Sequence, residues 1–136
     1  MSAAVTATAR PLLSTANLVG LAVAGVHGVV ELLGVPGGPL SLGSDPKPGE
    51  NGPPDVVLWF SGGMGLLTLV FAVLAWRFTS RAASRVVAGT RILANMTSWP
   101  AFFVGGVPAW LVTVAAAVAL LTAAEVYLVL RRPRAT

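Results

Sequence analysis

The chain has 136 residues, of which 55% are hydrophobic and only 10% charged, with a formal net charge of +4. A soluble domain carries about a quarter charged residues, so this composition excludes an ordinary water-soluble fold and favours one solvated by lipid. The absence of cysteine excludes disulfides and Cys-ligated metal sites. The arginines lie in short runs beside apolar segments, which is not the pattern of a nucleic-acid-binding face.

Four apolar segments have the length that a helix needs to cross a hydrocarbon core of about 30 Å. They cover about residues 12–33, 56–76, 86–103 and 108–130, and the third is the least apolar. Pro11 and Pro108 suit the first turn of a helix, and Gly34 suits a helix C-terminus. We therefore predict an all-α polytopic membrane protein, with residues 1–136 forming one antiparallel bundle of four transmembrane helices.

The placement of the basic residues predicts the orientation of this bundle. In a four-span arrangement only Lys47 lies on one side. The other side holds Arg10, Arg77, Arg81, Arg85, Arg131, Arg132 and Arg134. The positive-inside rule then places both termini in the cytoplasm. An alternative is a signal peptide over residues 1–24, cleaved after Ala24, but the apolar run continues to Leu33.

The composition also predicts a location. Arginine far outnumbers lysine, and Ala, Val and Gly are abundant, which is typical of coding in a GC-rich bacterial genome. We therefore expect a multi-pass protein of the bacterial cytoplasmic (inner) membrane.

Two of the loops between the predicted spans have a distinctive composition. Residues 34–55 hold six Gly and six Pro, which predicts a turn-rich external loop that is a plain spacer, a lid or a partner contact. Arg77, Arg81 and Arg85 recur every four residues, so a helical hairpin would place them on one face. There each could gain about 1 kcal/mol from anionic lipid headgroups, although membrane topology alone also explains them.

Small residues predict where the helices approach one another closely, because lipid supplies no hydrophobic force between them. Ala16, Gly20, Ala24 and Gly28 follow one another at four-residue spacing in the first span. A second seam in the span over residues 56–76 includes Gly65.

Two ionisable residues at matching depth predict an intramembrane ion pair. Arg91 and Glu125 each lie about 9 Å from the cytoplasmic end of adjacent antiparallel spans, at 1.5 Å per residue. We expect them to pair, with Asn17 or Thr122 as a supplement, and the pair could serve only to fix helix register. Alternatively, each side chain extends separately to the cytoplasmic headgroups.

A second polar site is predicted nearer the external end. His27 and Glu31 lie one turn apart in the first span, and Ser61, Asn95 and Ser98 approach the same level from other helices. Together they predict a small polar pocket in which a histidine beside a glutamate could support proton transfer. The alternative is a pair near the interface, hydrogen-bonded to each other and to water.

No catalytic constellation is present in the sequence. A single histidine excludes a bis-histidine haem site, and neither a phosphate-binding loop nor a nucleophile elbow occurs. We therefore expect no catalytic residues, no metal and no cofactor.

Two families offer partial resemblances. The size, the helix count and the basic loop from Arg77 to Arg85 resemble the layout of DoxX-like four-span proteins, as topology only. Small multidrug-resistance transporters are similar in size and use a glutamate in their first span. Here Glu31 lies nearer the external end, and the arginine asymmetry opposes dual topology.

The leading functional hypothesis is a non-enzymatic accessory or interaction subunit, or a binder of a lipid-like small molecule. Expected partners are membrane lipids and either a larger membrane complex or further copies of the chain, but not nucleic acid. The first alternative is a small transporter or proton-coupled carrier that uses His27, Glu31 and Arg91. The second is a DoxX-like membrane redox partner.

Overall fold

The computed structural model describes residues 13–41 and 47–132. These residues form four α-helices and a short 3-10 helix and contain no strand, which confirms the all-α prediction. The elements are α1 (Thr15–Leu33), α2 (Asp55–Phe78), α3 (Arg81–Met96), η1 (Trp99–Phe102) and α4 (Ala109–Leu130). The start of the first predicted span near residue 12, Arg10 and Arg134 lie outside the described residues.

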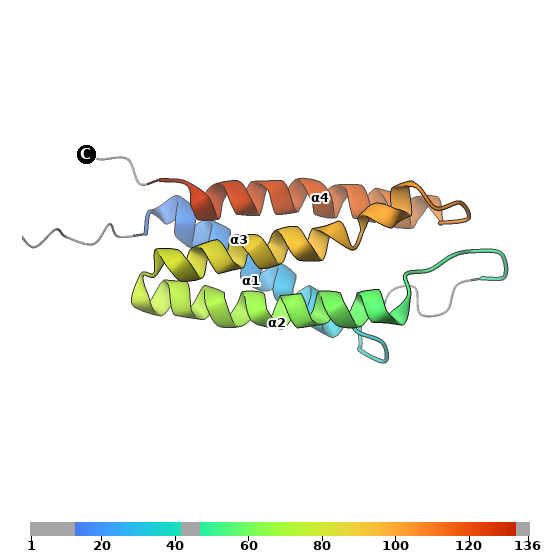
Figure 1. Cartoon of the computed structure of the whole chain (residues 1–136), viewed down its shortest axis with the longest axis horizontal. Helices are drawn as coiled ribbons and strands as arrows, with labels where there is room; N and C mark the ends of the chain where they lie inside the picture. The colour runs from blue at the N-terminus through green and yellow to red at the C-terminus, as the bar shows by residue number, and fades with distance from the viewer. Residues whose placement is uncertain (1–12, 42–46, 133–136) are drawn as a thin grey trace, which may run out of the picture.

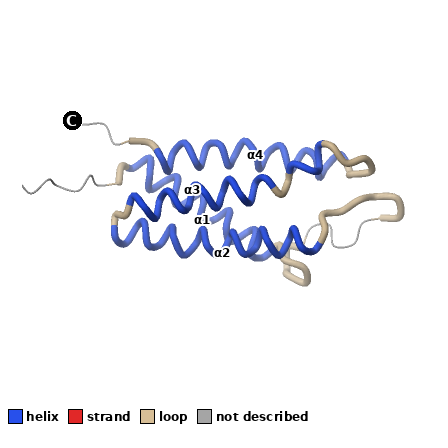
Figure 2. The backbone as a smooth tube through the Cα atoms, in the orientation of Figure 1, coloured by secondary structure: helices blue, strands red, loops and turns tan. Residues whose placement is uncertain are grey.

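The four helices lie side by side and alternate in direction along the chain (Figure 1). Helix α1 packs against α2 and α4, and α3 packs against the same two helices. The start of α1, the turn between α2 and α3 and the end of α4 lie together at one end (Figure 2). This end of the molecule carries Arg77, Arg81, Arg85, Arg131 and Arg132, whereas Lys47, Glu50 and Asp55 precede or begin α2 at the other.

Three helices are long and apolar enough to cross a membrane, namely α1, α2 and α4. Helix α3 has 16 residues. It begins at Arg81 and ends at Met96, so it starts and ends earlier than the predicted third span over residues 86–103. The Ser80 side chain accepts a hydrogen bond from the Ala83 N–H and starts the helix early. Beyond Met96 the chain turns into η1, which contains Pro100.

The turn between α2 and α3 separates the arginines that were expected on one face. Thr79 adopts a left-handed conformation with φ of 46°, and its N–H donates to the Ala75 carbonyl. Arg77 therefore lies in the last turn of α2, while Arg81 and Arg85 lie in α3. The three arginines are thus divided between two helices that this turn joins.

Glycines allow the helix backbones to approach closely. A Cβ added to Gly28 of α1 would lie 2.8 Å from the carbonyl oxygen of Gly65 on α2. A Cβ on Gly20 would lie 2.8 Å from the backbone nitrogen of Val129 on α4. The core is correspondingly made of small side chains such as Ala24 and Ala75, while many large apolar side chains face outward.

Asn17 joins the beginning of α1 to the end of α4. Its Nδ2 donates to the carbonyl oxygens of Leu128, Val129 and Arg131 at 2.9, 3.0 and 2.9 Å. Its Oδ1 accepts from the Ser14 N–H at 2.9 Å. The last carbonyls of a helix have no hydrogen-bond partner within it, and the Asn17 amide donates to these carbonyls of α4. The expectation that Asn17 supplements an ion pair was therefore wrong.

The described part of the predicted external loop is anchored to the turn before α4. The Asn51 N–H donates to the Gly106 carbonyl at 2.9 Å, and its Nδ2 donates to the Gly105 carbonyl at 2.7 Å. Gly106 has a φ of 80°, which suits glycine in a tight turn. The connections that follow α1 and α3 are therefore hydrogen-bonded to each other.

Candidate functional site

Four ionisable side chains from three helices meet in the interior, and we call them the charge cluster: His27 and Glu31 of α1, Arg91 of α3 and Glu125 of α4. All are largely withdrawn from the surface, with exposed fractions of 8%, 11%, 0% and 1% in that order. Four such groups are costly to bury unless they satisfy one another. The hydrogen bonds and ion pairs among these four groups are therefore what makes their burial possible.

Arg91 holds both glutamates. Its Nη1 and Nη2 donate to Oε2 and Oε1 of Glu31 at 2.6 and 2.8 Å, the bidentate arrangement that suits a guanidinium. Its Nε donates to Oε2 of Glu125 at 3.2 Å. One side chain of α3 thus links α1 to α4 through charge-assisted hydrogen bonds.

His27 lies between the same two carboxylates. Its Nδ1 is 2.9 Å from Oε1 of Glu125, and its Nε2 is 3.8 Å from Oε1 of Glu31. The cluster thus contains one guanidinium, two carboxyl groups and one imidazole whose two nitrogens both face a carboxyl oxygen.

The helices converge here for reasons visible in the sequence. Side chains lean toward the N-terminus of their own helix. Because α1 and α4 are antiparallel, the side chains of His27 and Glu125 lean toward each other. Beside the cluster, Thr68 of α2 and Thr90 of α3 share a hydrogen bond of 2.8 Å between their hydroxyls. That bond holds α3 against α2 one residue before Arg91.

The two predicted polar sites form a single site in this structure. Arg91 and Glu125 are in contact, but Arg91 also binds Glu31, and Glu125 also binds His27. Counted from Arg81, where α3 begins, Arg91 lies about 15 Å along its helix instead of 9 Å. At this depth Arg91 reaches Glu31 in the last turns of α1, a contact that the prediction from the span ends missed.

The other members of the predicted pocket do not join the cluster. Within the described residues, Ser61, Asn95 and Ser98 make no side-chain hydrogen bond with His27 or Glu31. The Oδ1 of Asn95 is enclosed without a hydrogen-bond partner. Thr122, expected to supplement the ion pair, is likewise buried with its hydroxyl unpaired. The short reach of these side chains leaves the long Arg91 as the partner of both glutamates.

The cluster does not resemble a metal site. The part of the chain that the structure describes contains no group of three or more His, Cys, Asp or Glu arranged to hold a metal ion. The space that a cation would occupy between the carboxylates is instead taken by the guanidinium of Arg91.

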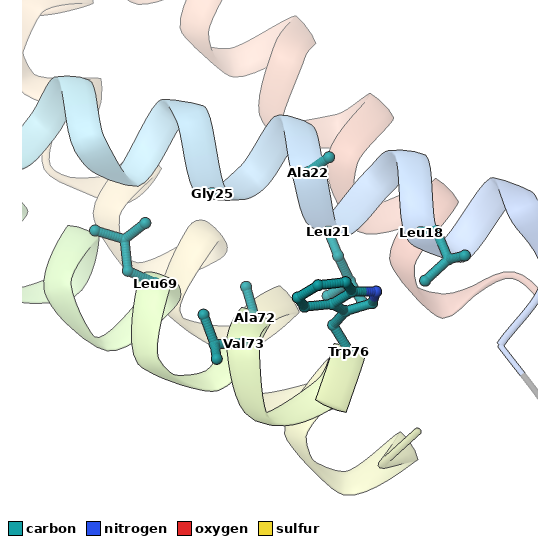
Figure 3. A pocket seen from close by; sticks show the side chains of 8 residues that line it. All are labelled: Leu18, Leu21, Ala22, Gly25, Leu69, Ala72, Val73 and Trp76. Carbon is teal, nitrogen blue, oxygen red and sulfur yellow. The ribbon is translucent and has the colours of Figure 1, made fainter. Parts of the chain in front are cut away.

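A second feature lies on the outer surface, which sequence reasoning missed. An apolar groove of about 290 Å³ runs between α1 and α2. We call it the α1–α2 groove; Figure 3 shows the side chains that line it, namely Leu18, Leu21, Ala22, Gly25, Leu69, Ala72, Val73 and Trp76. Ala22, Gly25 and Ala72 leave the space open, while the ring of Trp76 lies across one end. No charged side chain lines it.

The arginines predicted to meet lipid headgroups lie at the end of the molecule nearest Trp76. Arg77 and Arg85 are exposed, whereas Arg81 is half-buried with its Nε enclosed. Arg77 follows Trp76 directly in the last turn of α2.

Comparisons with protein-family models, with curated proteins and with solved structures found no match.

Proposed function

We propose that this chain is a four-span integral membrane protein with both ends in the cytoplasm. The three long apolar helices support the proposal. Helix α3 spans about 24 Å at 1.5 Å per residue, and η1 continues it toward the opposite end. Its one internal charge, Arg91, is fully buried and neutralised by glutamates. The arginines at the end shared by the α2–α3 turn and the end of α4 favour a cytoplasmic location for that end.

The absence of cysteine makes this topology testable with single cysteines. Pro48 and Ala82 are exposed near opposite ends of the bundle. Pro48→Cys should react with a membrane-impermeant maleimide on intact cells, and Ala82→Cys only after lysis. The reverse pattern, or equal labelling of both variants on intact cells, would overturn the proposed orientation.

We further propose that the protein acts without catalysis by binding one chain of a lipid-like molecule in the α1–α2 groove. The groove carries the proposal: it opens on the outer face, its lining is apolar, and its volume lies at the lower limit of the roughly 300–1,000 Å³ of small-molecule sites. A slender acyl chain fits such a slot better than a bulky ligand. Arg77, next to Trp76, supplies a cation for an anionic headgroup.

The charge cluster supports a non-catalytic role for the interior. Arg91 directs Nε and both terminal nitrogens at the two glutamates. Groups engaged in this way hold α1, α3 and α4 together and fix which faces meet. No residue of the charge cluster lines the α1–α2 groove. Binding in the groove and cohesion of the bundle are therefore separate tasks.

Filling the groove tests the proposal. A Cβ on Gly25 would lie 4.0 Å from its nearest neighbour, Leu69, so the Cβ of Gly25→Leu fits at this position and the rest of the leucine fills the groove that Gly25 lines. Gly63→Leu is the matched control, because nothing lies within 4 Å of a Cβ there. Native mass spectrometry of gently solubilised protein should show one retained lipid in the wild type and in Gly63→Leu, and a loss in Gly25→Leu.

Equal lipid retention in both variants would overturn lipid binding in the groove. If instead Gly25→Leu releases a co-purifying membrane protein and leaves lipid retention unchanged, the lipid proposal is wrong and the accessory-subunit hypothesis takes its place.

A second candidate function, a proton-coupled carrier, is favoured by His27 lying between two carboxyl groups. Proteoliposomes containing a carrier should acidify or alkalise when a substrate gradient is applied. Glu31→Gln should abolish that flux, and Glu50→Gln, in the external loop, should leave it intact. Flux that survives Glu31→Gln would exclude this candidate.

A further inference from the structure

We infer that the charge cluster binds one proton, which His27 shares with Glu31 and Glu125. This proton site is independent of the α1–α2 groove, so the failure of lipid binding would leave it standing. The inference rests on two observations, the balance of charges in the cluster and the contacts of the imidazole with two carboxyl groups.

The charges of the cluster balance only when one proton is added. Glu31 and Glu125 together contribute two negative charges, and Arg91 contributes one positive charge. No charged residue occurs between positions 56 and 76, so α2 supplies none to the interior. With exposed fractions of 11% or less, the cluster has little water to screen a residual negative charge. A proton on the imidazole or on one carboxyl group removes that residual charge.

The contacts of the imidazole lead to the same count of one proton. An ionised carboxylate only accepts hydrogen bonds, and a neutral imidazole donates from one nitrogen alone. Nδ1 of His27 is hydrogen-bonded to Oε1 of Glu125 at 2.9 Å, and Nε2 lies 3.8 Å from Oε1 of Glu31, which is longer than a hydrogen bond but within ion-pair distance. Arg91 cannot serve as an acceptor, so without an extra proton one ring nitrogen would direct its lone pair at a carboxyl oxygen.

The extra proton resolves this conflict in a defined way. As an imidazolium, His27 donates from Nδ1 to Glu125 and directs the Nε2 proton toward Glu31. Transfer of that proton to a glutamate breaks the N–H bond, forms an O–H bond and leaves the total charge unchanged. Uptake from water converts a hydronium ion into water, and release reverses this step.

The single histidine of the chain makes the proton directly observable. Full-length protein labelled with ¹⁵N-histidine in lipid nanodiscs gives ring nitrogen signals from His27 alone. At about pH 8, where an exposed imidazole is neutral, we expect either a doubly protonated ring or, in the infrared spectrum, the carbonyl stretch of a protonated carboxylic acid. A neutral ring together with fully ionised carboxyl groups would overturn the inference.

A charge-changing variant sharpens the test. Glu125→Gln removes one negative charge, so Arg91 and Glu31 balance each other and the proton is no longer needed. We expect a neutral ring and no protonated carboxyl group at about pH 8 in Glu125→Gln, whereas Glu50→Gln should give the wild-type spectra. Persistence of the proton in Glu125→Gln would overturn the charge-balance argument. If this variant fails to fold, the wild-type spectra alone decide.

Discussion

The close approach of α1 and α2 at Gly28 and Gly65 offers a sharp test of how the bundle is packed. A Cβ placed on Gly65 would lie 2.5 Å from the carbonyl oxygen of Gly28 and 3.1 Å from the Cβ of Glu31. Two residues earlier on the same helix, a Cβ on Gly63 would meet nothing within 4 Å. Gly65→Ala and Gly63→Ala therefore make the same chemical change in one helix, but only the first inserts a methyl group between two backbones.

The size of the effect follows from the distance. Ordinary contact begins near 3.4 Å, so α1 and α2 must separate locally by about 1 Å to admit the methyl group. A gap of about 0.5–1 Å already forfeits a quarter to a half of the dispersion attraction between facing atoms, and overpacking typically costs about 1–3 kcal/mol. The gain in helix propensity from Gly to Ala, about 0.5–1 kcal/mol, is common to both variants and cancels in the comparison.

We therefore expect Gly65→Ala to be less stable than Gly63→Ala by about 1–3 kcal/mol. The free energy of unfolding is measured on purified protein in mild detergent, titrated with a denaturing detergent and followed by far-ultraviolet circular dichroism. Equal stability of the two variants would refute the close backbone approach at Gly28 and Gly65.

The remaining predictions concern other buried or strained positions. Arg91→Gln should cost about 3–5 kcal/mol because it leaves two carboxylates without their shared partner, and a loss no greater than that of the exposed Arg85→Gln in the same detergent titration would contradict the charge cluster. Asn17→Ala should destabilise the protein by about 1–3 kcal/mol and speed amide exchange near the end of α4, so unchanged exchange there would argue against the Asn17 contacts. Thr79→Gly should stabilise it by about 1–2 kcal/mol, read as a higher Tm, because only glycine adopts a positive φ without strain; a lower Tm would show that the Thr79 conformation carries no such cost.

The sequence was most informative about the long apolar helices. Continuous apolar runs between Pro, Gly and Arg residues located α1, α2 and α4 to within a few residues, because length and hydropathy alone decide whether a helix suits a membrane. Helix α3 was placed poorly since its mixed composition gives no sharp edge. Its start depends on one capping hydroxyl, that of Ser80, whose effect is hard to distinguish from that of any other serine.

The contacts within the candidate site were harder to predict from the sequence than the bounds of the helices. Equal depth along two spans led to the pairing of Arg91 with Glu125, whose side chains are in contact. The contacts of Arg91 with Glu31 and of His27 with Glu125 depend on how far each side chain reaches and on the offset between antiparallel helices. The position of Asn17 sets that offset by holding α1 against the last carbonyls of α4. No periodicity within one helix encodes an offset between two.

That amide also has a consequence for how the chain is made. Asn17 and its acceptors lie 111 to 114 residues apart along the chain, so the ribosome delivers the amide long before the carbonyls to which it donates. The end of α4 then supplies the acceptors of a helix that was made first. A premature stop before Leu128 would therefore deprive α1 of these acceptors as well as shortening α4.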